Sequence, residues 1–72
     1  MTDFDYHKFL RDKFGDVDRL VAFLHTYRHD IPRATVNQWF RRASVPADHF
    51  ATLLMLLEMD VGGPVSLVEY VR

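Results

Sequence analysis

The sequence predicts a small all-α domain of four to five helices. Apolar residues recur three and four positions apart in several segments, which is the spacing of one face of an α-helix. Glycine and proline separate these segments at Gly15, Pro32, Pro46 and Gly62. With 72 residues, 49% of them hydrophobic, the chain is expected to form one domain over residues 1–72, near the lower size limit for a self-sufficient core.

The first two helices are expected over about residues 3–14 and 17–27. Gly15 is expected to end the first helix, and Asp16 can cap the second by accepting backbone N–H bonds. Their apolar faces consist of Tyr6, Phe9, Leu10 and Phe14 in the first helix and Val17, Leu20, Val21 and Leu24 in the second.

A third helix is expected over about residues 33–43. Pro32 disfavours helical geometry at Ile31 and is well placed at the start of a new helix. The segment 44–46 (Ser-Val-Pro) breaks the helix. Its buried side is expected to consist of Val36, Trp39 and Phe40.

A fourth helix, over about residues 47–59, is apolar on nearly all sides, whereas a surface helix needs only one apolar stripe. A turn at 62–64 (Gly-Gly-Pro) and a capping-box pattern from Ser66 to Glu69 predict a short last helix over 66–71. The first stripe consists of Phe50, Leu53, Leu54 and Leu57, and the second of Ala51, Met55, Leu56 and Met59.

The second apolar stripe predicts a homodimer. The short last helix can cover only part of the stripe, and an exposed apolar patch on a small domain usually marks an interface. The chain also has no cysteine, so its stability must come from helix packing or from a partner subunit. The expected interface residues are Met55, Leu56, Met59, Leu67, Val68 and Val71.

The charge distribution is consistent with a DNA-binding surface. The chain carries a net charge of −1, but residues 28–42 contain four arginines and one aspartate, a local net charge of +3. Attraction to DNA depends on which face carries the positive charge. The same distribution also fits an ordinary solvated helix face, so charge alone leaves both interpretations open.

The stretch 31–46 (IPRATVNQWFRRASVP) resembles the recognition helix and following turn of phage repressor and Cro-type helix-turn-helix regulators. Ala22 resembles the small residue that lets the preceding helix pass close to the recognition helix. The resemblance spans about residues 18–57 and implies a lambda-repressor-like fold with the recognition helix over 33–42. The positions that carry the resemblance are Val36, Trp39, Arg41, Arg42 and Pro46.

The resemblance implies a sequence-specific regulator of transcription that binds double-stranded DNA. Asn and Gln can pair with adenine, and Arg pairs bidentately with guanine. Arg33, Asn37 and Gln38 are the expected base readers, and Ala34 can contact a thymine methyl group. The expected phosphate contacts are Arg41, Arg42, Arg28 and Arg19.

The chain departs from the family pattern in the turn between its second and third helices. Thr26 stands where the family usually has glycine, and residues 27–30 lengthen the turn. Pro32 replaces the usual serine or threonine cap, which leaves Asp30 as the candidate acceptor for the first N–H groups of the third helix. A longer turn bears on the angle between the two helices and on which residues reach bases.

Other classes of function are not expected from the sequence. His25 and His29 have a metal-like spacing, but no third ligand is evident, so we expect no metal or other cofactor. No phosphate loop or nucleophile motif is present, and we expect neither an enzyme nor a small-molecule substrate. The longest apolar run, residues 53–57, is too short to cross a membrane, and Asp3 and Asp5 argue against a signal peptide, so a cytoplasmic protein is expected.

The alternative is a helix-turn-helix module that binds another protein, such as an antitoxin or a phage-encoded inhibitor. A fold does not fix a function. The overall negative charge and the long turn at 27–30 favour this alternative. DNA binding depends steeply on salt, whereas binding to a protein partner need not, so the two functions can be separated by experiment.

Overall fold

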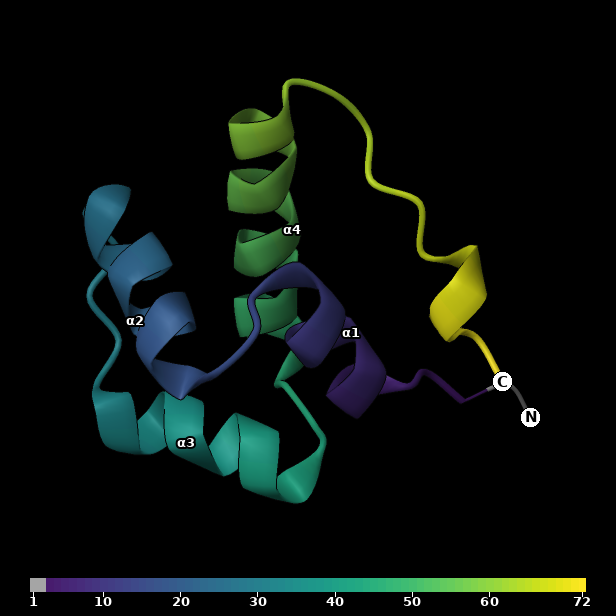
Figure 1. Cartoon of the computed structure of the whole chain (residues 1–72), viewed down its shortest axis with the longest axis horizontal. Coiled ribbons are helices and arrows are strands. Elements are labelled where there is room, and N and C mark those ends of the chain that lie inside the picture. The colour runs from purple at the N-terminus through teal and green to yellow at the C-terminus, as the bar shows by residue number, and fades with distance from the viewer. Residues whose placement is uncertain (1–2) are drawn as a thin grey trace.

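The computed structural model describes residues 3–72 and contains four α-helices and a short 3-10 helix (Figure 1). Within this range the only β-type pairing is an isolated antiparallel bridge between Phe4 and Val71, so the expected all-α class is confirmed. The helices are α1 (Tyr6–Lys13), α2 (Val17–Thr26), α3 (Arg33–Arg42), α4 (Ala47–Val61) and η1 (Val68–Tyr70).

The helix α1 begins three residues later than the expected start at residue 3. Asp5 is its N-cap, and the carboxylate of Asp5 accepts a hydrogen bond of 3.1 Å from the backbone N–H of Lys8. Residues 3–5 pair instead with the C-terminal end of the chain. The N–H of Asp5 donates to the carbonyl of Tyr70, and the N–H of Arg72 donates to the carbonyl of Asp3 at 2.8 Å. The second of these bonds occupies the carbonyl of Asp3, which a helix starting at residue 3 would have used for its first intrahelical bond.

The boundary between α1 and α2 follows its local sequence signals. Gly15 adopts a φ of 92°, a left-handed conformation that favours glycine. Asp16 is the N-cap of α2, and its carboxylate accepts a hydrogen bond of 2.9 Å from the N–H of Arg19. Both expectations for this turn are therefore confirmed.

The helix α3 begins at Arg33 without a side-chain cap. Pro32 occupies the N-cap position, and no side chain accepts a hydrogen bond there. The expectation that Asp30 caps this helix is wrong, because the carboxylate of Asp30 lies 3.4 Å from Nδ1 of His25. The helix ends at Arg42, and Ala43 at its C-cap has a left-handed φ of 53°.

The helix α4 runs two residues beyond its expected end at residue 59. It stops at Gly62, which has a φ of 78° and donates its N–H to the carbonyl of Glu58 at 2.9 Å. The Glu58 carboxylate also accepts a hydrogen bond of 3.0 Å from the N–H of Val65. These bonds tie the returning chain to the end of α4.

The expected last helix over 66–71 is a single 3-10 turn, η1, over three residues. The capping box from Ser66 to Glu69 does not form, because Leu67 occupies the N-cap position and no side-chain hydrogen bond is made there. Tyr70 instead fixes this segment against α1. The residue is 1% exposed, and its hydroxyl donates to the carboxylate of Asp12 at 3.2 Å.

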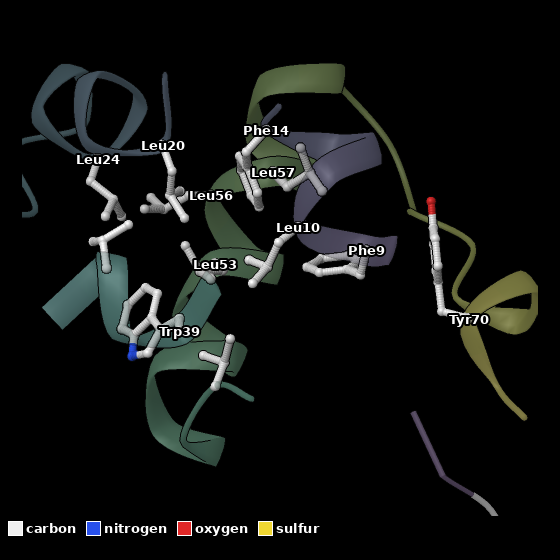
Figure 2. Packing of buried hydrophobic residues seen from close by; sticks show 12 residues of the cluster. Phe9, Leu10, Phe14, Leu20, Leu24, Trp39, Leu53, Leu56, Leu57 and Tyr70 are labelled. Atoms are coloured by element: carbon white, nitrogen blue, oxygen red, sulfur yellow. The ribbon is translucent and has the colours of Figure 1, made fainter. Parts of the chain in front are cut away.

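One apolar core joins all the elements. In Figure 2, Trp39 from α3, Leu53 and Leu56 from α4, and Leu10 from α1 point toward one another. Half-buried residues such as Phe40, Phe50 and Leu54 pack against the edge of this core. The buried residues are Phe9, Leu10, Phe14, Leu20, Leu24, Val36, Trp39, Val45, Leu53, Leu56, Leu57 and Tyr70.

The arrangement leaves one side of α3 uncovered. In Figure 1, α2 and α4 rise from the same side of α3, and α3 runs across their lower ends. The helices α2 and α3 are in close contact, and α1 contacts η1. The two ends of the described chain lie side by side. The helix α3 is thus held from one side and open on the other.

Candidate nucleic-acid interface

The outer face of α3 carries the expected DNA-contacting residues. Arg33, Ala34, Gln38 and Arg41 are exposed there, and Asn37 is half-buried. Arg42, at the end of the helix, is also exposed. The side chains that point the other way, Val36 and Trp39, are 0% and 3% exposed. The helix therefore has a polar, basic face toward solvent and an apolar face anchored in the core.

Trp39 anchors α3 to the rest of the domain, as expected of a core residue. Its indole lies beside Leu53 of α4 (Figure 2). The buried Val45 secures the following turn in the same core. Because α3 is fixed at its centre and at its end, its outer side chains project from a rigid base.

Arg28 and Arg19 lie on the elements that precede α3. Arg28 is exposed in the turn between α2 and α3, and it has a positive φ of 57°. Arg19 is exposed in the first turn of α2, and its side chain folds back over Gly15. Both guanidinium groups are therefore on the surface, on segments directly connected to α3 or in contact with it.

Arg33 forms an ion pair that the sequence did not predict. Its Nη2 lies 2.8 Å from Oδ1 of Asp18, and its Nε donates to the same oxygen at 2.9 Å. Asp18 lies in the first turn of α2. The pair joins the starts of the two helices and offsets the charge of Arg33. The free positive charge of α3 is therefore concentrated at its C-terminal end, on Arg41 and Arg42.

Two hollows adjoin the C-terminal half of α3. The first, about 250 Å³, lies between α3 and the start of α4. The second, about 180 Å³, is lined by Gln38, Arg41 and Arg42. The hollow of about 250 Å³, between α3 and α4, is lined by Thr35, Gln38, Trp39, Arg42, Ser44, Pro46 and His49.

The sequence indicated no binding role for Thr35, Ser44 or His49, which line the first hollow. They come from α3, the following turn and α4, so helical periodicity gives no signal that they meet. Their hydroxyl and imidazole groups can donate hydrogen bonds, and Arg42 lines the same hollow. This part of the surface is suited to an anionic group.

The expected interface residues are not all on the surface. Met55, Met59, Val68 and Val71 are exposed large hydrophobic residues, and Leu67 is half-buried. Leu56 is 6% exposed and packs in the core, so the expected outward stripe through Leu56 is wrong. In Figure 2, Leu56 lies beside Leu20 of α2, which covers that flank of α4.

No group of three His, Asp or Glu side chains in residues 3–72 is arranged to hold a metal ion. Among the helices described, none combines the length and apolar character needed to cross a bilayer. Comparisons of the chain with protein-family models, with curated protein sequences and with solved structures give no match.

Proposed function

We propose that this protein is a sequence-specific DNA-binding regulator of transcription, of the phage repressor and Cro type. The observation that carries the proposal is the two-sided character of α3. Its exposed side presents amide and guanidinium groups, and its opposite side is fixed in the core by Val36 and Trp39. A rigid helix of this kind fits the major groove, where each base pair presents a distinct pattern of donors and acceptors.

The side chains of α3 divide into two proposed roles. Asn37 and Gln38, at the middle of the exposed face, pair with adenine through their amide groups, while Arg33 pairs with guanine and Ala34 contacts a thymine methyl group. The remaining arginines hold phosphates and set the register of the helix along the duplex. These phosphate-binding residues are Arg41, Arg42, Arg28 and Arg19.

The regulator acts as a homodimer in this proposal. One recognition helix reads only a few base pairs, whereas two helices related by a twofold axis read half-sites about 34 Å apart. Met55 and Met59 are 55% and 62% exposed and lie one helical turn apart on α4. With Val68 and Val71 of the C-terminal segment, they supply the apolar side chains for the contact between copies.

A second candidate function is binding to another protein, as in an antitoxin or a phage-encoded inhibitor. The ion pair between Asp18 and Arg33 favours it, because a carboxylate beside the start of α3 opposes the approach of phosphates. The exposed methionines of α4 favour it as well, since flexible methionine side chains suit adaptable protein interfaces.

Selection from a pool of randomised duplexes tests the proposed function. Tagged wild-type protein is expected to enrich one sequence motif, with two related half-sites. The double variant Asn37→Ala/Gln38→Ala, verified as folded by circular dichroism, is the matched control and is expected to enrich no equivalent motif. If the duplexes bound by the wild type stay random in sequence after repeated rounds, the proposal of sequence-specific DNA binding is rejected.

A further inference from the structure

The ion pair between Asp18 and Arg33 has a geometry that bears on how Arg33 meets a base. Both Nε and Nη2 of the guanidinium approach Oδ1 of Asp18, at 2.9 and 2.8 Å. The carboxylate therefore occupies one edge of the planar group. The side chains are 63% and 76% exposed, so the pair lies on the surface beside the start of α3.

The guanidinium keeps a second edge for another partner. Arginine has five N–H donors in a fixed planar arrangement, and the edge taken by Asp18 uses Nε–H and one N–H of Nη2. The donors of Nη1 and the second N–H of Nη2 point away along the end of the side chain. Two neighbouring N–H groups are what guanine requires, because its O6 and N7 accept a bidentate contact.

We propose that Asp18 is a positioning residue that determines specificity, because it holds Arg33 for bidentate contact with one guanine. The inference rests on the proposed DNA-reading function and deepens it. An unpaired arginine side chain on a helix surface samples many rotamers, and ordering them costs free energy on binding. Asp18 restricts that freedom before DNA arrives, and it is not itself expected to touch the duplex.

The proposal predicts two effects of opposite direction when Asp18 is removed. Loss of the carboxylate removes a negative charge near the DNA, so the sequence-independent part of binding becomes tighter. Loss of the ion pair with Asp18 lets the Arg33 side chain sample more rotamers, so the preference for guanine at one base-pair position becomes weaker. An acid that acted only by repulsion would produce the first effect alone.

The chain offers a matched control in Asp30. This residue is also exposed and close to the start of α3, but its carboxylate faces His25. Asp30→Ala therefore removes a negative charge from the same region and leaves the ion pair between Asp18 and Arg33 in place. Arg33→Ala defines the result expected when the guanine contact is lost completely.

The experiment measures dissociation constants of the wild type, Asp18→Ala, Asp30→Ala and Arg33→Ala by fluorescence anisotropy. Each folded protein is titrated with the best duplex selected by the wild type, with duplexes in which each G·C pair is replaced, and with a random duplex. Arg33→Ala should lose discrimination at one G·C pair, roughly 5- to 150-fold for a bidentate contact. Asp18→Ala should lose about two- to fivefold in discrimination at that same pair, as befits an exposed ion pair, and bind random duplex about two- to fivefold more tightly.

Asp30→Ala should tighten random binding similarly and keep full discrimination. Equal discrimination in Asp18→Ala and Asp30→Ala overturns the positioning role while leaving DNA reading intact. A wild type that discriminates among no duplexes overturns both the proposed function and this inference.

Discussion

The indole of Trp39 lies 5.2 Å from the imidazole of His49, measured between ring centroids, with the ring planes at 44°. This contact joins the candidate recognition helix α3 to the first turn of α4. Trp39 also reaches the core beside Leu53. On the outer side, Trp39 and His49 both line the hollow that Arg42 also lines. One side chain thus links the packing of the domain to the surface proposed to bind DNA.

Trp39→Ala is expected to unfold the domain. Removing a buried aromatic side chain costs on the order of 3–5 kcal/mol, which is comparable to the whole stability expected of so small a protein. Urea denaturation followed by circular dichroism measures the loss. Val61→Ala, at an exposed position outside the proposed dimer contact, is the control and is expected to cost less than about 1 kcal/mol. A Trp39→Ala protein that folds normally and loses only binding would contradict the anchoring role.

Substitutions on α3 are expected to separate base reading from phosphate binding. Asn37→Ala or Gln38→Ala should cost about 1–3 kcal/mol at one or two base pairs and leave random binding nearly unchanged. Arg42→Ala should weaken binding to all duplexes alike and reduce the salt slope by roughly one. Titrations of the selected duplex and its single-pair variants measure both effects. If both kinds of variant weaken every sequence equally, α3 does not lie in the major groove as proposed.

Two substitutions on α4 are expected to distinguish the core from the proposed dimer contact. Met59→Glu should give a folded monomer, because Met59 is 62% exposed and its apolar surface is proposed to face a second copy. Leu56→Glu should not fold, because it places a charge in the core. Sedimentation and circular dichroism measure assembly and folding. A wild type that sediments as a monomer at high micromolar concentration, free and with DNA, would contradict the dimer.

The stability of the domain is expected to fall at alkaline pH because of Tyr70. Burial of the phenol, together with the neighbouring carboxylates of Glu69 and Asp12, raises the pKa of Tyr70 well above its ordinary value of 10.0. Above about pH 10 the unfolded chain loses the phenol proton while the folded chain retains it, so the free energy of unfolding decreases as pH rises.

Tyr70→Phe removes that titration. Urea midpoints at about pH 8 and pH 11 are expected to differ less in this variant than in the wild type. The variant also lacks the hydrogen bond from Tyr70 to Asp12, which lowers its stability at both pH values. That loss cancels when the two midpoints of the same protein are compared. An equal loss of stability in the two proteins would show that Tyr70 does not carry the alkaline effect.

Elements bounded by local signals were predictable from the sequence. The cap at Asp16 and the left-handed turn at Gly15 each follow from neighbouring residues, and the structure has both. The ends of the chain were not predictable in this way. Residues 3–5 and 66–71 were expected to be helical, but their backbone groups bond across the domain, as between Asp5 and Tyr70. Pairing between distant segments leaves no periodic pattern.

The candidate site was predictable only in part for the same reason. The exposed side of α3 follows from helical periodicity around Val36 and Trp39. The partner of Arg33 does not, because Asp18 is fifteen residues earlier and meets it only through the packing of α2 against α3. The burial of Leu56 likewise depends on which flank of α4 its neighbours cover.

The salt dependence of binding to a random duplex tests the central claim most directly. Three to five phosphate contacts per subunit predict a slope of log affinity against log salt of roughly −2.7 to −4.5 per subunit. The double variant Arg41→Glu/Arg42→Glu changes only exposed side chains and should stay folded but lose binding at about 50 mM salt. A wild type that does not bind duplex at that salt concentration, or whose slope is near zero, would contradict the account.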